Sequence, residues 1–185
     1  MSRIGGKNIF VASNVRLFKF ENFILILGLF GNFRFRFNFP VKILKKNRLV
    51  ELYPLKKYKQ EKQLNAAWGT LRSHFFNCTY GASNNFNIFF RLIGVGFKMF
   101  KKHEKIILRL GLSHQIFLEV PFKKINIKKV QKRPLTFLFS SSDYDLLQNI
   151  SFFIRQFKKP DIYKGKGFNF ERELIKLKQG KELKN

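Results

Sequence analysis

Residues 32–39 read Asn-Phe-Arg-Phe-Arg-Phe-Asn-Phe, so aromatic and polar side chains alternate along this stretch. A period of two matches a β-strand, in which successive side chains point to opposite faces. We therefore expect the four phenylalanines to face a core, with Arg34 and Arg36 turned toward solvent or a ligand. A base-stacking platform is the alternative use of such rings, but alternating apolar residues in a strand most often belong to a core.

Strands are expected on both sides of this stretch. Residues 23–30 form the longest apolar run of the chain, and Gly28–Gly31 predicts a turn at its end. The run is far shorter than the roughly 20 residues of a membrane-spanning helix. Residues 41–44 and 49–53 predict a hairpin that ends at Pro54.

The spacing of apolar residues then changes to that of a helix. Between residues 60 and 80 they recur at intervals of three and four, which predicts a helix with one apolar stripe. Gly81 follows where a C-terminal cap is expected. The stripe consists of Leu64, Ala67, Trp68, Leu71, Phe75 and Cys78.

The second half of the chain repeats this order of strands and then a helix. Ser141-Ser142-Asp143 predicts the start of the helix, because hydroxyls supply caps and carboxylates favour the positive helix end. Pro160 predicts where it stops. The expected strands are residues 86–93, 96–100, 106–110, 115–120, 125–130 and 135–139, with a turn at 102–104. The apolar stripe of the helix is Leu146, Leu147, Ile150, Phe153, Ile154 and Phe157.

Strands followed by a helix, twice over, predict an α+β fold. We expect two tandem domains of similar plan, each with an antiparallel or mixed sheet packed on one helix. The first domain would span residues 1–81 and the second residues 82–160. Residues 161–185 would form a basic C-terminal tail, since residues 155–185 hold ten basic residues and four acidic ones.

The charge of the chain indicates the class of its partner. Its 185 residues include 37 Lys and Arg against 11 Asp and Glu, a formal net charge of +26. A chain this positive repels itself, so nucleic acid is the first expected partner, ahead of an anionic membrane surface or an acidic protein. The 45% of hydrophobic residues excludes disorder throughout. The single cysteine, Cys78, cannot form an internal disulfide, which is compatible with a reducing compartment.

Residues suited to catalysis do not converge in the sequence. The eleven carboxylates are scattered, and neighbours such as Ser113 and His114 would point to opposite faces of a strand, which works against a nucleophile–base pair. His74 and Cys78 have the spacing of half a zinc site, but no second pair follows. Gly94-Val95-Gly96 lacks the rest of a dinucleotide fingerprint and predicts a bend. We expect no enzyme activity, metal, cofactor or small-molecule substrate.

The segment Tyr163-Lys164-Gly165-Lys166-Gly167-Phe168 places glycines and lysines at alternate positions. Glycine lets a backbone approach a phosphate closely, lysine supplies positive charge, and the two rings can stack on a base or a ribose. A flexible, solvated tail is an equally good explanation of the same residues.

Four blocks of sequence carry a family resemblance that covers essentially the whole chain. The first is Met1-Ser2-Arg3-Ile4-Gly5, and the second is Trp68-Gly69-Thr70-Leu71-Arg72 with Asn77 and Gly81. The third is Leu92-Ile93-Gly94-Val95-Gly96-Phe97-Lys98 with Leu108–Leu112, Ser113-His114 and Pro121. The fourth, and most specific, is Ile154-Arg155 with Pro160-Asp161-Ile162-Tyr163-Lys164-Gly165-Lys166-Gly167-Phe168, followed by Lys178-Gln179-Gly180-Lys181. Together they resemble the bacterial-type large-subunit ribosomal protein L-six family, although Ser140-Ser141-Ser142 replaces a glycine that is usual there.

The resemblance implies two similar α+β domains, no catalysis and a place on the factor-binding side of the large ribosomal subunit. Members of that family bind large-subunit rRNA mainly through the second domain, near the sarcin–ricin loop and the stalk base, where other ribosomal proteins are neighbours. Residues 163–167 would lie against the rRNA backbone. The residues implied to bind rRNA are Lys98, Ser113, His114, Arg155, Lys158, Lys159, Tyr163, Lys164, Gly165, Lys166 and Gly167.

Composition also bears on the compartment. The 25 phenylalanines, with abundant Lys, Asn and Ile, indicate an AT-rich gene. The start of the sequence has neither the apolar stretch of a secretory signal nor the Arg- and Ser-rich stretch of an organelle presequence. Together these features predict synthesis inside an organelle, with the mitochondrion favoured over a plastid or an AT-rich bacterium.

Two other functions stay open at this point. A basic, aromatic-rich protein can bind a membrane surface through amphipathic helices with aromatic residues on the apolar face. The last predicted helix has such residues but also carries Asp143 and Asp145. An RNA-processing enzyme would share the charge, yet it requires a carboxylate or metal constellation that the sequence does not offer.

Overall fold

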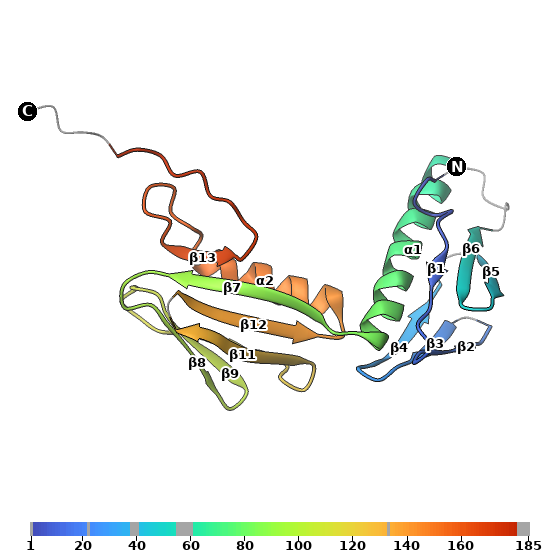
Figure 1. Cartoon of the computed structure of the whole chain (residues 1–185), viewed down its shortest axis with the longest axis horizontal. Helices are drawn as coiled ribbons and strands as arrows, with labels where there is room; N and C mark the ends of the chain where they lie inside the picture. The colour runs from blue at the N-terminus through green and yellow to red at the C-terminus, as the bar shows by residue number, and fades with distance from the viewer. Residues whose placement is uncertain (1, 22, 38–40, 55–60, 133, 181–185) are drawn as a thin grey trace, which may run out of the picture. The chain divides into compact units, whose positions relative to one another are not determined.

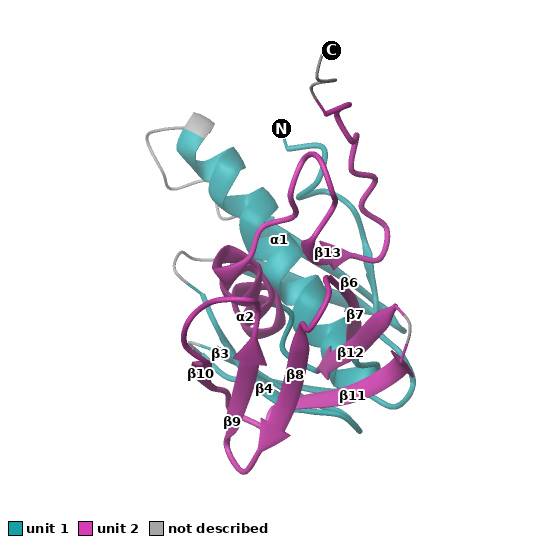
Figure 2. Ribbon diagram, turned by 90° about the vertical axis from the view of Figure 1, so that its left-hand side faces the viewer, with its two compact units in different colours: residues 1–85, 142–144 teal, residues 86–141, 145–185 magenta. Residues whose placement is uncertain are grey.

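In the computed structural model, residues 2–21, 23–37, 41–54, 61–132 and 134–180 are described (Figure 1). They belong to two compact units (Figure 2). Unit 1 comprises Met1–Asn85 with Ser142–Tyr144, and unit 2 comprises Phe86–Ser141 with Asp145–Asn185. The described residues form two helices and thirteen strands, and all strand pairings among them are antiparallel. The predicted α+β class is confirmed.

Unit 1 contains two three-stranded sheets and a long helix, with strand orders β1-β6-β5 and β2-β3-β4. The predicted glycine turn joins β3 to β4, where the Gly28 N–H donates to the Gly31 carbonyl at 3.2 Å. The predicted hairpin is formed by β5 and β6. The elements are β1 (Ile9–Phe10), β2 (Arg16–Lys19), β3 (Phe23–Leu27), β4 (Asn32–Arg36), β5 (Val41–Lys46), β6 (Leu49–Pro54) and α1 (Glu61–Ser83).

The alternating stretch forms β4 and faces as predicted. Its phenylalanines up to Phe37 are half-buried and pack against the core of unit 1, whereas Arg34 and Arg36 are exposed. Phe39 lies outside the described residues. The rings of this strand therefore serve the core rather than a stacking platform.

The helix predicted for residues 60–80 is α1, and its Trp68 and Phe75 side chains are buried as expected. It continues past Gly81, however, so the predicted cap is wrong. The reason lies in tertiary packing: Ala82 is fully buried in the core, and its carbonyl accepts a hydrogen bond from the β3–β4 turn at 3.2 Å. A glycine inside a helix costs only about 1 kcal/mol relative to alanine, which such packing offsets.

Unit 2 contains a four-stranded sheet of order β11-β12-β7-β13, a three-stranded sheet of order β10-β9-β8 and a shorter helix. The six strands predicted for this half all form, with ends shifted by at most two residues. The helix begins directly after Asp143, as its capping residues predicted. The elements are β7 (Phe86–Ile93), β8 (Lys98–Lys102), β9 (Lys105–Arg109), β10 (Ile116–Glu119), β11 (Ile125–Lys132), β12 (Leu135–Ser141), α2 (Tyr144–Phe157) and β13 (Gly167–Phe170).

One face of the four-stranded sheet builds the core of unit 2. The register places Leu92 beside Leu135 and Phe168, and all three side chains pack in this core. Leu147 of α2 and Leu108 of β9 belong to the same cluster. The helix and the three-stranded sheet therefore close the core over that face.

The strand β13 was not predicted from the sequence. It lies in the expected tail, pairs with β7 and buries Phe168, which is 1% exposed, in the core. The sequence Gly-Phe-Asn-Phe is too short to show a period. The short strands β1 and β2 were missed for the same reason. The division into residues 1–81, 82–160 and 161–185 stays a prediction.

Candidate nucleic-acid interface

The lysine–glycine segment forms a closed loop organised by Asp161. The Asp161 N–H donates to the Lys166 carbonyl at 2.9 Å, and the Gly165 N–H donates to the Asp161 carbonyl at 2.9 Å. The Asp161 carboxylate accepts hydrogen bonds from the N–H groups of Tyr163 (3.3 Å) and Lys164 (3.2 Å). An aspartate side chain that bonds to the backbone just after itself is a common way to fix a turn. The loop therefore has a defined shape.

The two glycines of this loop have positive φ angles, and Gly167 lies directly against the protein's own backbone. Gly165 has a φ of 65°, and Gly167 has a φ of 144°. A Cβ atom on Gly167 would lie 2.6 Å from the carbonyl oxygen of Lys159, at the end of α2. Next to it, the Phe168 N–H donates to the Lys158 carbonyl at 3.0 Å. Gly167 thus allows β13 to start against the helix end, and both glycines are buried.

The charged and aromatic side chains of the loop point to solvent. Lys164 and Lys166 are exposed, and Tyr163 is 57% exposed. Neither lysine pairs with a carboxylate in the part of the chain that the structure describes. Two ammonium groups and a phenol ring on a loop of fixed shape can contact phosphates and stack on a base or a ribose.

Arg155 is placed differently from the other predicted residues. Its guanidinium pairs with Glu173 and lies 5.1 Å from the centroid of the Phe170 ring. The side chain is about a quarter exposed, at 26%. Arg155 therefore ties the segment after β13 to α2. Lys158 and Lys159, just past the helix, are half-buried and exposed respectively.

Lys98, Ser113 and His114 belong to the three-stranded sheet of unit 2 and its loops. Lys98 begins β8, and Ser113 and His114 lie in the exposed loop between β9 and β10. The argument that the latter two point to opposite faces of a strand is wrong, because they lie outside any strand. Ser113 Oγ is 3.5 Å from His114 Nδ1, the limit for a hydrogen bond. Such an exposed, long contact gives the serine little activation.

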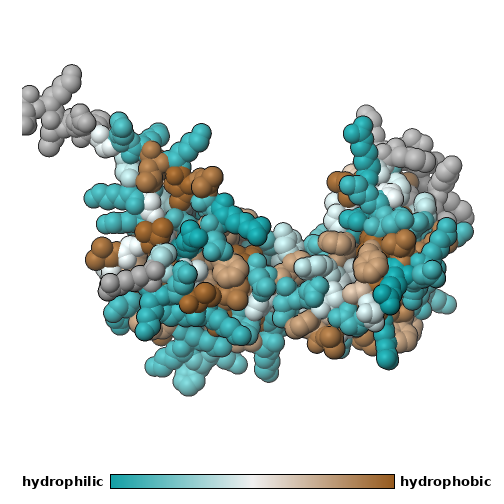
Figure 3. Space-filling view, viewed as in Figure 1, coloured by the Kyte–Doolittle hydropathy of each residue, from teal (hydrophilic) through white to brown (hydrophobic). Residues whose placement is uncertain are grey.

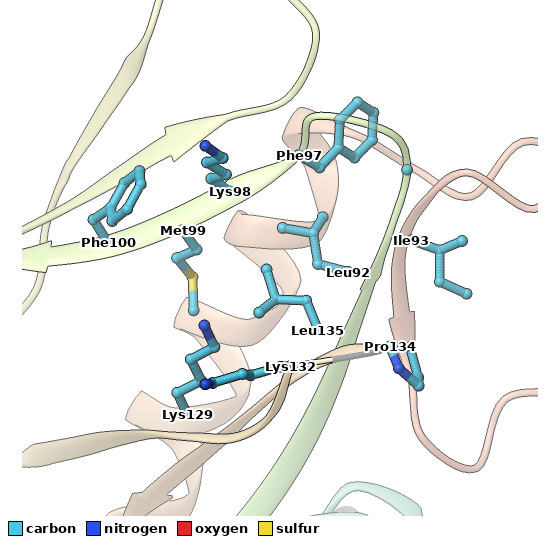
Figure 4. Close-up of a pocket in the computed structure, with 11 residues that line it drawn as sticks. Leu92, Ile93, Phe97, Lys98, Met99, Phe100, Lys129, Lys132, Pro134 and Leu135 are labelled. Atoms are coloured by element: carbon cyan, nitrogen blue, oxygen red, sulfur yellow. The ribbon is translucent and has the colours of Figure 1, made fainter.

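The predicted residues thus form two groups. One lies at the end of α2 and in the lysine–glycine loop, and the other lies in the three-stranded sheet and its loops. Gly167 pairs with Ile93, and the chain continues from Ile93 through the bend at residues 94–97 to Lys98. The sequence analysis missed further lysines near this bend. Lys129 and Lys132 of β11 line, with Lys98, a hollow of about 510 Å³ (Figure 4). Asp161 was also missed as the residue that organises the loop, although the Pro-Asp pair is a turn signal.

Other classes of site find no geometry in the described residues. In these parts of the chain, no group of three or more His, Cys, Asp or Glu side chains could hold a metal ion. His74 is exposed and Cys78 is half-buried on α1. Among the described helices, neither α1 nor α2 has the length and apolar character needed to cross a membrane. Hydrophilic side chains project from both units, between smaller apolar patches (Figure 3).

Comparison with known proteins identifies the family. No family model matches the chain. Large ribosomal subunit protein uL6 of Persephonella marina is 32% identical over 189 residues, which cover 99% of this chain and 99% of the relative. Large ribosomal subunit protein uL6m of Reclinomonas americana is 30% identical, with 98% of this chain and 100% of the relative covered. Large ribosomal subunit protein uL6c of Phaeodactylum tricornutum is 31% identical over 100% of both chains.

These relatives are ribosomal proteins and not enzymes, and the match runs the length of both chains. It includes the blocks that carried the resemblance to the L-six family. The chain therefore belongs to the large ribosomal subunit protein uL6 family.

Proposed function

We propose that this chain is a structural constituent of the large ribosomal subunit and binds large-subunit rRNA mainly through unit 2. The observation that carries the proposal is the ordered, basic loop at residues 161–166. Its Lys164 and Lys166 are exposed without a carboxylate partner among the described residues. The net charge of +26 favours a polyanionic partner.

The mechanism is electrostatic contact combined with recognition of RNA shape. Lysines that neutralise phosphates release counterions, so the affinity falls steeply with salt. Lys158 and Lys159 extend the basic region from the loop to the end of α2. Because hydrogen bonds to Asp161 already fix the loop, binding loses less conformational entropy than with a flexible tail. Tyr163 adds a ring that can stack on an exposed base.

The place within the subunit follows from the family. The resemblance supports a position near the sarcin–ricin loop and the stalk base, with neighbouring ribosomal proteins as further partners. It also supports two similar domains, residues 1–81 and 82–160, followed by an rRNA-binding tail at residues 161–185. The presence of two compact units supports a two-domain plan, although their bounds differ from these ranges and the second unit includes the proposed tail.

The compartment we propose is the mitochondrion, with a ribosomal protein encoded in the organelle. The phenylalanine-rich composition supports this choice. The relatives include a bacterial uL6, an uL6m and an uL6c, so a plastid or an AT-rich bacterium are the alternatives.

A membrane surface is the second candidate partner, because α2 exposes Phe152 and Phe153, at 53% and 52%. A surface-binding helix needs cations beside its apolar face. Arg155, the basic residue in the last turn, is engaged by Glu173, and Asp145 lies in the first turn. Vesicles of anionic lipid at physiological salt should therefore leave the protein in solution, and cosedimentation with them would favour this candidate.

The first test is sedimentation of a cell lysate through a sucrose gradient at low and at high salt. We expect the protein in the large-subunit fraction at low salt and its release at high salt. A variant with Lys164→Ala and Lys166→Ala should be released at lower salt than the parent. Recovery of the parent in light or membrane fractions at low salt would contradict the proposal.

A further inference from the structure

The hollow beside Lys98 combines an apolar floor with a basic rim. Leu92 of β7, Met99 of β8 and Leu135 of β12 point toward one another at its centre (Figure 4). Leu92 and Met99 are buried members of the unit 2 core. Because these side chains are packed in the core, the floor has its shape without a ligand. Phe97, in the bend before β8, and Phe100 of β8 also line the hollow.

Two of the rim lysines face this floor because β11 contains a bulge. Lys129 pairs with Phe137, and Lys132 pairs with Leu135, with a register shift between Lys129 and Gln131. Side chains alternate along a regular strand, so residues three apart would point to opposite faces. The extra residue of the bulge returns Lys132 to the face of Lys129. Both lysines thus lie over the apolar floor, on the face that otherwise builds the core.

The charge of the rim is not neutralised by the protein itself. The residues that line the hollow include Lys98, Lys129 and Lys132 and no carboxylate. None of the three pairs with a carboxylate among the described residues. Ammonium groups above an apolar surface complement a ligand in which anionic groups are joined to a flat ring. A nucleotide within an RNA strand has this composition in every unit, whereas an acidic peptide has it only where an aromatic residue lies beside its carboxylates.

The hollow continues into a smaller one along the strands. The second hollow, of about 290 Å³, shares Met99, Phe100 and Lys129 with the first and adds Lys101. The Lys101 ammonium lies 4.3 Å from the centroid of the Phe122 ring. Two adjoining hollows lined by lysines suit a polymer that inserts one unit into the larger hollow and continues along the surface.

We propose that the larger hollow receives one unstacked nucleotide of large-subunit rRNA. The base lies on Leu92, Met99 and Leu135, and the flanking phosphates meet the three lysines of the rim. This inference rests on the rRNA binding proposed above. Pockets of about 300–1,000 Å³ commonly take small organic groups, and RNA-binding proteins commonly hold unstacked bases on apolar or aromatic surfaces.

The test uses the full chain bound to large-subunit rRNA transcribed with 4-thiouridine, which cross-links on irradiation to residues that touch the base. We expect a cross-linked peptide that contains Phe97, Met99 or Phe100. Acetylation of surface lysines, read by mass spectrometry, supplies a second measurement. Acetylation of Lys129 and Lys132 should fall severalfold when the RNA is bound.

Matched variants distinguish binding in this hollow from nonspecific attraction to the positive charge of the protein. Lys129→Gln with Lys132→Gln should abolish the cross-link and lower the salt dependence of binding by about two units, one for each lost contact. Lys123→Gln with Lys124→Gln removes the same charge from exposed positions outside the hollow. This control should leave the cross-link in place.

The outcomes distinguish this inference from the proposed function. If RNA binds but cross-links only elsewhere, and Lys129 and Lys132 stay reactive, the pocket is overturned while rRNA binding stands. Failure of the chain to bind rRNA at low salt overturns both. If the lysines are protected in assembled large subunits but not by rRNA alone, a neighbouring protein fills the hollow, and the nucleotide assignment is overturned.

Discussion

An arginine attaches the N-terminal segment to one helix, and another attaches the C-terminal segment to the other helix. The two attachments use different interactions. At the N-terminal side, Arg72 of α1 donates hydrogen bonds to the carbonyls of Lys7 and Asn8, both at 3.3 Å. Trp68, one turn earlier, is buried under the same segment, and a Cβ on Gly5 would lie 2.4 Å from its ring. This attachment consists of neutral acceptors and a packed indole.

At the C-terminal side the attachment is ionic. Arg155 of α2 pairs with Glu173 and covers the ring of Phe170. The pair is about a quarter exposed on each side, at 26% and 27%. Partly exposed ion pairs weaken as salt screens them, whereas the packing of an indole does not.

The two attachments should respond differently to salt. The segment with the neutral attachment is held by contacts that salt screens little. The segment with the ionic attachment includes the loop that presents Lys164 and Lys166. Salt that weakens contacts between these lysines and phosphates also weakens the pair that holds their segment, so ordering and binding should respond to salt together.

The largest effect is expected from removing the indole of the N-terminal attachment. Trp68→Ala should lower the free energy of unfolding of unit 1 by about 3–5 kcal/mol, because it leaves a cavity and deprives the Leu52 carbonyl of its indole donor. Urea unfolding followed by circular dichroism measures the loss. Phe10→Ala, at a side chain 62% exposed in the same unit, should stay within about 0.5 kcal/mol of the parent. Similar losses in both variants would show that the indole is not the main attachment.

Adding one methyl group at the start of β13 should detach the C-terminal segment. Gly167→Ala introduces a Cβ against the Lys159 carbonyl at a backbone conformation that favours glycine. The expected cost is about 1–3 kcal/mol. It should appear as faster hydrogen exchange of the Phe168 amide. Gly180→Ala, where nothing lies within 4 Å, is the control and should change neither quantity.

Removing the charge of the ionic attachment should have a smaller effect. Glu173→Gln should destabilise the docking of residues 167–178 by about 1 kcal/mol, since the pair with Arg155 is partly screened by solvent. Limited proteolysis at low and high salt measures it, and the parent should approach the variant as salt rises. Glu171→Gln breaks the more exposed pair with Arg91 and should cost at most about 0.5 kcal/mol. If salt left the parent's protection unchanged, the contrast between the two attachments would fail.

The smallest effect on folding is expected from removing the two loop lysines, which should have the largest effect on rRNA binding. Lys164→Ala with Lys166→Ala should leave unfolding unchanged, since both side chains are exposed. The same variant should reduce the salt dependence of rRNA binding by about one unit per lost contact. Lys42→Ala with Lys45→Ala makes the same change of charge in unit 1. An equal reduction in that control would show that binding is not concentrated in unit 2.

The sequence predicted secondary structure correctly where apolar residues recur at a regular spacing over several residues. The alternation predicted the buried face correctly for residues 32–37, and the α1 stripe did so through Trp68 and Phe75. In α2, Leu147 and Ile154 are buried as predicted, but Phe153 of the predicted stripe is exposed.

Prediction failed where a contact distant in the chain decides the outcome. The helix α1 continues through Gly81 because Ala82 meets the β3–β4 turn, and β13 forms because β7 offers an edge.

The candidate interface shows the same limit. The sequence predicted that the lysines and glycines of residues 163–167 contact RNA. In the structure, Gly167 lies against the Lys159 carbonyl just past α2, a contact that no local pattern reveals. Lys129 and Lys132 were not selected, because a regular strand would separate them and the bulge between them leaves no signature in the sequence.

The position of β13 also bears on how the chain is made. The last strand of unit 2 to be synthesised completes a sheet beside β7, the first strand of that unit. Until residues 167–170 leave the ribosome that makes them, the edge of β7 stays open and the core lacks Phe168. Unit 2 therefore cannot finish folding strand by strand as it emerges. Its lysine loop, which ends where β13 begins, becomes ordered in the same step, so the rRNA contacts proposed for this loop can form only after β13 has paired with β7.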